Sequence, residues 1–332
     1  MRYIRRWGVT GAAVLVALAM AAGSASAQGQ AAGGGRGGAP QPLVDHELKP
    51  NIHWFEGGGG NSTVIIGTNG VIVVDAKTTP AAATELLADI AKLTPKPVTT
   101  VLITHSDGDH VNGLQSFPKG LTIIAHQNCK TEMQAAANAA ALADWMPTRL
   151  VTKSPEDMTI EGVKIRAYNF GPAHTSGDLM FYLPDEKLMI AGDMVALQSA
   201  YPLIHLEKNG SSDGWFASMN GIVATDAVSF VSGHGTVQTK ADLQKRVADS
   251  NARRTQIRAL VAQGKSLDEV RQALNEPPPA ARGGGGGGQA PAAAPGGGAP
   301  QAAVGGAGRG TFPNFQDFTG VVVAEQLKKT AN

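Results

Sequence analysis

The sequence predicts a layered α/β fold, and three observations support this prediction. Short apolar runs rich in β-branched residues alternate with segments of helical periodicity between residues 43 and 275. A chain that is 42% hydrophobic and 17% charged can bury the core of a large domain. Glycine and proline are concentrated at residues 28–40 and 276–311, so the rest of the chain has an ordinary globular composition.

The first predicted elements are a hairpin, a helix and a strand. Two β-branched runs, 62–66 and 71–74, flank Thr68-Asn69-Gly70. Because Asn-Gly readily adopts the positive φ angles of a tight turn, these runs predict a β-hairpin. Leucine and isoleucine at helical spacing predict a helix over 80–92, and an apolar run predicts a strand over 98–103.

The later elements continue the alternation. They are predicted as a strand over 121–125, a helix over 130–143, and strands near 158–168, 178–183, 187–191 and 227–231. After Lys240, apolar residues at helical spacing predict a helix that ends at Gly264. Ser266-Leu267-Asp268-Glu269 is typical of a capping box and predicts a further helix.

The N-terminal 27 residues have the pattern of a secretory signal peptide. Arg2, Arg5 and Arg6 precede an apolar run over 11–22, and Ala25-Ser26-Ala27 follows. The run is too short for a comfortable bilayer span, so we expect cleavage after Ala27 and no stable membrane span. The mature protein is predicted to be periplasmic or extracellular.

Composition divides the rest of the chain into four segments. Residues 28–42 are predicted to be a flexible Gly/Ala/Pro leader, and residues 43–275 the folded domain. Residues 276–311 contain almost no large apolar side chains and are predicted to be a disordered insert. Residues 312–332 regain apolar side chains and predict a C-terminal helix that packs on the domain.

Charge and cysteine content exclude several functional classes. The formal net charge of +1, with no cluster of lysine and arginine on a predicted helix, argues against nucleic acid as a partner. Cys129 is the only cysteine, which excludes an intramolecular disulfide and any site built from several thiolates. Metal chemistry in this chain must therefore use histidine and carboxylate side chains.

Potential metal ligands follow the predicted strand over 98–103. In Thr104-His105-Ser106-Asp107-Gly108-Asp109-His110, four imidazole or carboxylate side chains fall within six residues. A loop that leaves a strand can direct them into one cavity, and both donor types suit divalent metal ions. On this segment alone, an Asp/Gly turn with incidental histidines remains the alternative.

Three later segments also place a histidine or aspartate beside a predicted strand end. They are Gly171-Pro172-Ala173-His174-Thr175-Ser176-Gly177-Asp178, Ile190-Ala191-Gly192-Asp193 and Ser232-Gly233-His234-Gly235. Together the four segments resemble the metallo-β-lactamase superfamily, whose usual signature is HxHxDH followed by separate His, Asp or Cys, and His residues. The resemblance covers roughly residues 43–275 and implies a four-layer αββα sandwich.

The resemblance also implies a set of metal ligands. His105, Asp107 and His174 would hold a first metal, Asp109, His110 and His234 a second, and Asp193 would bridge the two. The expected cofactors are two divalent metal ions, zinc foremost, with iron and manganese as alternatives. Asp109 would additionally orient the metal-bound hydroxide that attacks the substrate.

Asp107 departs from the family signature, because it stands where the second histidine is usual. With three carboxylates, two divalent ions keep a formal charge of +1 rather than +2, which predicts a weaker Lewis acid. Two histidines and one carboxylate also suit iron(II) or manganese. Two hypotheses stay open: Asp107 binds the first metal, or Asp107 does not bind and that site is weak or empty.

Other residues near the motifs carry less weight. His126 is interpreted as a structural histidine, and His205 either lines a substrate pocket or lies on the surface. The glycine-rich segment 56–61 resembles the loop that borders the cavity in this family, with Trp54 and Phe55 as an apolar wall or as core residues.

The function implied by the resemblance is that of an exported metal-dependent hydrolase. A hydroxide bound by two metals would attack an ester, thioester, amide or lactam in a small-molecule substrate. Two alternatives remain open. One is a mononuclear iron oxidoreductase resembling the family's sulfur dioxygenases, using His105, His174 and Asp193; the other is a metal-binding module without catalysis.

Overall fold

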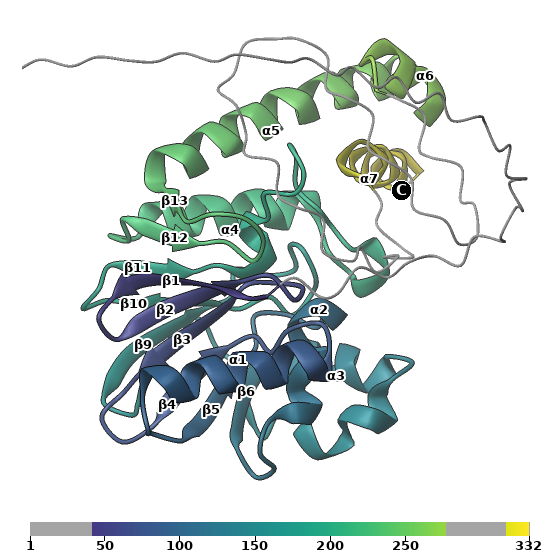
Figure 1. Cartoon of the computed structure of the whole chain (residues 1–332). Coiled ribbons are helices and arrows are strands. Elements are labelled where there is room, and N and C mark those ends of the chain that lie inside the picture. Colours follow the sequence, from purple (N-terminus) through teal and green to yellow (C-terminus); the bar gives the residue numbers. More distant parts are fainter. Residues whose placement is uncertain (1–41, 277–316, 332) are drawn as a thin grey trace, which may run out of the picture. The chain divides into compact units, whose positions relative to one another are not determined.

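The structure is a computed structural model that describes residues 42–276 and 317–331. The predicted signal peptide, most of the leader and all but the first residue of the predicted insert lie outside the described residues. Within them, two sheets pack face to face with helices on their outer faces (Figure 1). This arrangement has the four layers, αββα, that the sequence predicts.

The first sheet, called sheet A, combines an antiparallel half with a parallel half. Its strands lie in the order β1 (Val44–Lys49), β2 (Ile52–Glu56), β3 (Ser62–Ile66), β4 (Val71–Val74), β5 (Val98–Leu102), β6 (Thr122–His126) and β7 (Arg149–Val151). Strands β1 to β4 pair antiparallel, and β4 to β7 pair parallel. All four residues of β4 are buried, as expected for a strand covered on both faces.

The second sheet, called sheet B, is mostly antiparallel. Its strands lie in the order β13 (Gln238–Thr239), β12 (Ser229–Val231), β11 (Leu188–Ile190), β10 (Met180–Leu183), β9 (Val163–Tyr168) and β8 (Glu156–Ile160). Only β11 and β12 pair parallel within this described sheet. The carboxyl ends of these two strands therefore point the same way, which matters for the site below.

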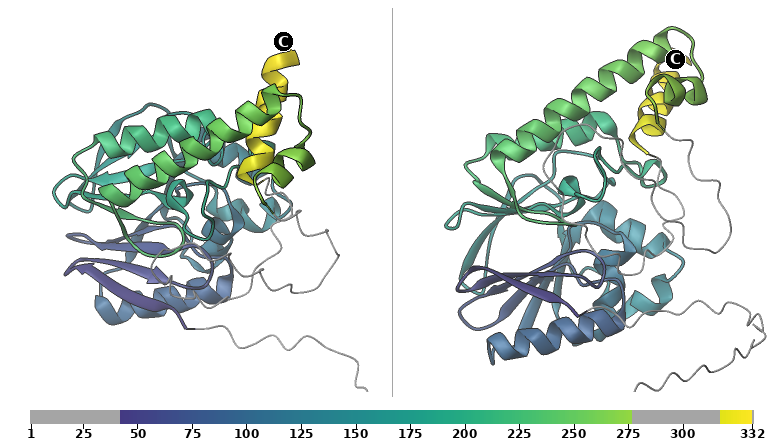
Figure 2. Two further views of the ribbon diagram at one scale, coloured as in Figure 1. Left: turned by 90° about the horizontal axis from the view of Figure 1, so that it is seen from above. Right: turned by 45° about the horizontal axis from the view of Figure 1, so that its top comes forward.

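Helices cover the outer faces of both sheets. Beside sheet A lie α1 (Pro80–Leu93), α2 (Gly108–Val111), α3 (Gln127–Ala135) and the 3₁₀ helices η1 (Asn112–Ser116) and η2 (Ala139–Trp145). Beside sheet B lie α4 (Ser212–Ala224), α5 (Lys240–Ala262), α6 (Leu267–Ala273), α7 (Phe318–Ala331) and the 3₁₀ helices η3 (Gly192–Val195) and η4 (Leu206–Lys208). Figure 2 shows α5, α6 and α7 together on that side.

Three apolar clusters hold these layers together. One packs α1 and α3 on sheet A, the next lies between the sheets, and the third packs α4 to α7 on sheet B. In the middle cluster, Ile72 and Leu102 of sheet A face Phe181 and Ile190 of sheet B. Burial of these side chains, each worth about 1.5–3 kcal/mol, drives the two sheets together.

Local sequence signals explain where several helices begin. Thr79 caps α1 by accepting a hydrogen bond from Ala82 N, and Pro80 occupies the first turn. The predicted capping box at Ser266 and Glu269 is confirmed at the start of α6. Helix α5 begins with a similar box at Thr239 and ends before Gly264, as predicted.

Two local predictions are wrong. The hairpin of β3 and β4 forms, but Asn69 and Gly70 do not have positive φ angles, because the loop is longer than a two-residue turn and closes with Gly67 N donating to Gly70 O. The helix predicted over 130–143 is split into α3 and η2. His126 caps α3 earlier by accepting from Asn128 N, and the exposed alanines after Met133 bury nothing that would hold a continuous helix.

Lys77 is a charged side chain inside this core. It is fully buried, and its ammonium donates hydrogen bonds to Phe55 O, Gly57 O and Gly60 O at 2.7, 2.9 and 3.0 Å. Lys77 thereby holds the glycine-rich segment that follows β2. Burial lowers the pKa of Lys77 to about 7, although the charge of Asp75 opposes this shift.

This burial predicts a pH dependence of stability. Between pH 7 and 10.5 the unfolded chain keeps a proton on Lys77 that the folded protein has released, so the free energy of unfolding rises with pH. The gain is at most about 1.4 kcal/mol per pH unit. Denaturant unfolding of the chelated protein at pH 7, 8 and 9 should show this slope, and Lys77→Met should lack it. Exposed Lys153→Met is the control; equal slopes for Lys77→Met and the wild type would contradict the prediction.

Candidate metal centre

The four motif segments meet at one edge of the two sheets, because each follows the carboxyl end of a strand. His105 and Asp107 follow β5, while Asp109 and His110 lie in α2 directly after them. His174 lies between β9 and β10, Asp193 follows β11 in η3, and His234 follows β12. All seven candidate ligands from the sequence are therefore brought together.

A first cluster consists of His105, Asp107 and His174, whose donor atoms all lie within 4.8 Å of one another. Asp107 Oδ2 is 3.6 Å from His105 Nε2 and 3.3 Å from His174 Nε2. His174 Nδ1 lies 2.7 Å from the carbonyl oxygen of Leu203, which can only accept. The Nδ1 nitrogen therefore carries a proton in every state, and Nε2 is the nitrogen available to a metal ion.

A second cluster consists of Asp109, His110 and His234. Asp109 Oδ2 is 3.0 Å from His234 Nε2 and 3.8 Å from His110 Nε2. The side chain of His234 is 18% exposed whereas that of His110 is fully buried, so the cluster is reached by solvent from the side of His234.

Asp193 lies between the two clusters. Its carboxylate oxygens are 3.4 Å from His110 Nε2, 3.5 Å from His234 Nε2 and 3.9 Å from His174 Nε2. Gly233 allows this position, since a β-carbon there would lie 2.0 Å from Asp193 Oδ1. The carboxylate can therefore share its oxygens between two neighbouring ions.

The side chains fit divalent metal ions. His105 Nε2, His110 Nε2, His234 Nε2 and Asp193 Oδ1 are buried and have no hydrogen-bond partner among the described residues. Buried polar atoms are rarely left without a hydrogen-bond partner, because each such atom lowers the stability of the fold by about 1–3 kcal/mol. Imidazole nitrogens and carboxylate oxygens converging on a small volume are the donors that zinc and related ions bind.

The clusters are strongly coupled electrostatically. Burial disfavours a charge on Asp193, but the neighbouring His234 and His110 outweigh it and hold the pKa of Asp193 well below its usual range. Burial likewise opposes protonation of His174, but Asp107 outweighs it and raises the pKa of His174 to about 9. A metal ion bound by His174 Nε2 would displace the proton from that nitrogen.

Asp75 is a positioning residue that the sequence analysis missed. It follows β4, and its carboxylate accepts hydrogen bonds from Thr104 N, Thr104 Oγ1 and His110 Nδ1 at 2.8, 2.7 and 2.8 Å. Since the Thr104 hydroxyl donates to Asp75, it accepts from His105 Nδ1 at 2.9 Å. Asp75 thus orients one histidine of each cluster. An aspartate after an apolar strand was its only sequence signal.

The remaining residues of interest lie as follows. Phe55 and Trp54 are core residues, not a cavity wall, and Trp54 stacks on His46 at 4.1 Å. Gly60 approaches the His110 ring so closely that a β-carbon would lie 2.3 Å from it, so segment 56–61 does border the site. Burial raises the pKa of the Cys129 thiol, in keeping with a packing role.

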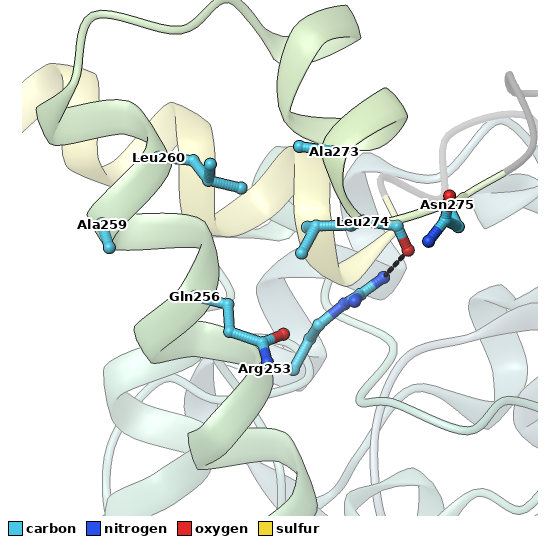
Figure 3. A pocket seen from close by; sticks show the side chains of 7 residues that line it. All are labelled: Arg253, Gln256, Ala259, Leu260, Ala273, Leu274 and Asn275. Carbon is cyan, nitrogen blue, oxygen red and sulfur yellow. Dashed lines mark hydrogen bonds between the residues drawn. The ribbon is translucent and has the colours of Figure 1, made fainter.

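A separate pocket of about 500 Å³ lies between α5 and α6 (Figure 3). It is lined by Arg253, Gln256, Ala259, Leu260, Ala273, Leu274 and Asn275. Arg253 is paired with Glu276 Oε1 at 2.5 Å, and the described lining provides no imidazole or carboxylate. The pocket therefore shares no residue with the two clusters of candidate metal ligands.

None of the described helices is both long and apolar enough to cross a membrane.

Comparison with known sequences identifies related proteins. The chain is 27% identical over 196 residues to 2,4-dinitroanisole O-demethylase subunit alpha of Nocardioides sp. (strain JS1661), covering 58% of this chain and 57% of the relative. It is 24% identical over 181 residues to Metallo-beta-lactamase type 2 of Bacillus cereus, covering 53% of this chain and 67% of that relative. It is 25% identical over 207 residues to atrochrysone carboxyl ACP thioesterase of Claviceps purpurea (strain 20.1), covering 62% of this chain and 61% of that relative. The chain thus spans less than two thirds of the demethylase subunit.

Solved structures share the fold. The sec-alkylsulfatase Pisa1 from Pseudomonas sp. superposes with a TM-score of 0.58 at 17% identity, over 71% of this chain and 46% of that chain. The DIM-1 metallo-beta-lactamase superposes with a TM-score of 0.52 at 19% identity, over 64% of this chain and 99% of that chain. The predicted four-layer sandwich is confirmed. Residues 55–234, which include all seven clustered residues, match the profile of the metallo-beta-lactamase superfamily, and the chain belongs to that family.

Proposed function

We propose that this protein is an exported, metal-dependent hydrolase that cleaves an ester, thioester, amide or lactam in a small-molecule substrate. Its seven ligands would be His105, Asp107, Asp109, His110, His174, Asp193 and His234. Export is proposed from the signal-peptide pattern of residues 1–27.

The position of Asp193 is the observation that carries this proposal. Its oxygens lie within 3.4–3.9 Å of histidines from both clusters, so one carboxylate can serve two ions. When bound, a pair of divalent ions supplies a water of lowered pKa and polarises the substrate's carbonyl oxygen. A single buried ion-binding cluster would have no need of a carboxylate placed between two sets of ligands.

Each side chain of this chain has a definable task in such a site. Asp109 Oδ2 faces His234 at the solvent-reached side, where it can accept a hydrogen bond from the attacking water and so orient it. Asp75 and Thr104 hold His105 and His110 with Nε2 directed into the clusters. The network therefore fixes the donors before substrate arrives.

The relatives support acyl cleavage as the first reaction to test. One is named a lactamase and another a thioesterase, and both names denote attack at a carbonyl carbon. The demethylase subunit and the alkylsulfatase carry names of other bond cleavages. Thioesters and activated esters come first because their leaving groups need little protonation.

Metal content of the mature protein, residues 28–332, purified without added metal or chelator, tests the proposal. We expect about two zinc ions per chain by mass spectrometry, and hydrolysis of at least one thioester, ester or lactam that is lost on chelation and regained with zinc. Protein without any bound metal would overturn the proposal. One iron per chain with oxygen-dependent turnover would replace it by the oxidoreductase alternative, for which His105, His174 and Asp193 would supply two histidines and one carboxylate.

A further inference from the structure

His205 lies against Asp107 of the first cluster, although it belongs to none of the four sequence segments. It directly precedes η4, its side chain is 7% exposed, and its Nε2 is 2.9 Å from Asp107 Oδ2. Its ring lies 4.9 Å from that of His174 at an interplanar angle of 77°. The two possibilities raised by the sequence, a pocket wall or a surface position, both miss this placement.

Three imidazole nitrogens surround one carboxylate oxygen. Asp107 Oδ2 is 2.9 Å from His205 Nε2, 3.3 Å from His174 Nε2 and 3.6 Å from His105 Nε2. Around a tetrahedral ion with bonds of about 2.1 Å, neighbouring donor atoms are separated by about 3.4 Å. The separations to His174 and His105 are close to this value, and the shorter separation to His205 is a hydrogen-bond distance that places Nε2 where an ion would replace its proton.

The tautomer of His205 also suits a ligand. His205 Nδ1 lies 2.6 Å from Glu207 Oε1, and because a carboxylate accepts, Nδ1 carries a proton. Nε2 is then the nitrogen available to a metal; without an ion it donates to Asp107 Oδ2 at 2.9 Å, and a bound ion would replace that proton. A carboxylate on the outer nitrogen of a metal-binding histidine is a common arrangement that raises the basicity of the ligand.

The loop that carries His205 is fastened to His174. His205 N donates to His174 O at 2.8 Å, and His174 Nδ1 donates to Leu203 O at 2.7 Å. Gly210 closes the loop by donating to His205 O at 2.8 Å, and a β-carbon at Gly210 would lie 2.5 Å from His174 O. The two imidazoles are therefore positioned as a pair.

The contacts of Lys208 determine which carboxylate oxygen of Asp107 faces the three histidines. Its ammonium forms an ion pair with Asp107 Oδ1 and donates a hydrogen bond to Ser106 Oγ at 3.0 Å. The second oxygen, Oδ2, is left facing the three histidines. The positive charge of Lys208 also offsets the negative charge that Asp107 adds to the cluster.

We infer that His205 is a metal ligand. Its imidazole takes the place of the second histidine of the family signature, the position that Asp107 occupies in this sequence. The ion of the first cluster is then held by His105, His174 and His205, with Asp107 Oδ2 as a further ligand. This inference rests on the proposed metal-dependent function and sharpens it, because three imidazoles favour zinc over the iron suited to two histidines and one carboxylate.

His205→Cys provides a direct spectroscopic test with cobalt(II) as the probe. A thiolate bound to cobalt(II) produces an intense near-ultraviolet charge-transfer band, and the native Cys129 is buried in the helix-covered core of sheet A. We expect the band in His205→Cys and not in the wild type. His53→Cys is the matched control, because His53 is a buried histidine paired with a different carboxylate, Asp45 at 2.9 Å.

His205→Gln provides a second test by zinc titration against a chelator, with circular dichroism to verify folding. We expect one of the two zinc ions to bind at least about 100-fold more weakly, and no change in His53→Gln. Two tight zinc ions in folded His205→Gln and no band in folded His205→Cys would overturn the inference while leaving the proposed function intact. Wild-type protein that binds no zinc would overturn both.

Discussion

Asp193→Ala is expected to lower kcat/KM for the best acyl substrate by about 10³-fold or more and to reduce bound zinc from two ions to one or fewer. The carboxylate of Asp193 lies between histidines of both clusters, so its removal takes a ligand from each ion at once. A loss of about 4 kcal/mol of transition-state stabilisation corresponds to this factor. Steady-state kinetics and metal analysis of one preparation measure both effects.

The control for this variant is Asp157→Ala. Asp157 is an exposed aspartate of β8 that pairs with Arg166 at 2.6 Å and does not belong to either cluster. It should keep two zinc ions and full activity. Asp193→Ala protein with two zinc ions and more than about a tenth of wild-type activity would show that Asp193 does not bridge the ions.

Removal of α7 is expected to prevent stable folding. Phe318, Val321, Val322 and Val323 are buried against α5 and its neighbours in the cluster on sheet B. Each side chain contributes about 1.5–3 kcal/mol by burial, so their combined loss is comparable to the whole stability of a typical domain. Glu325 adds a polar contact by accepting from Ser212 N at 2.8 Å, at the first turn of α4.

A graded series measures this effect without relying on an unfolded protein. Chains ending at residue 316 should give little soluble, cooperatively unfolding material, and Phe318→Ala should lower the free energy of unfolding by about 3–5 kcal/mol. Leu327 is 54% exposed on the same helix, so Leu327→Ala should change stability by less than about 0.5 kcal/mol. Equal free energies of unfolding for the shortened and full chains would show that α7 does not contribute to the stability of the domain.

The sequence predicted elements best where a local pattern decides the conformation. The runs of β3, β4 and β5 are rich in β-branched residues and mostly buried, and the capping boxes of α5 and α6 lie entirely within four residues. Helix α4 was missed because Gly214 and Gly221 weaken its helical signal. Both glycines are required by contacts, since a β-carbon at Gly214 would lie 1.7 Å from Pro172 O and one at Gly221 2.4 Å from the Phe170 ring.

In the candidate site, too, residues in local motifs could be predicted from the sequence and residues defined by distant contacts could not. Histidines and aspartates that follow predicted strands could be recognised from the sequence, since each motif lies beside a strand end. Asp75, His205 and Lys208 could not, because their roles come from contacts with residues at least 29 positions away. Such contacts exist only once β4, β5 and the loop before η4 lie side by side, and no short pattern encodes that proximity.

The metal clusters also have a consequence for how the protein opens. His105, Asp107, Asp109 and His110 follow a strand of sheet A, whereas His174, Asp193 and His234 follow strands of sheet B. Ions bound by both groups can bind tightly only while the two halves of the sandwich remain together, so metal concentration enters the free energy of separating them. At free metal 100 times the dissociation constant this linkage amounts to about 2.7 kcal/mol per site. Metal supply would then set how long each molecule resists proteases, in addition to how fast it turns over substrate.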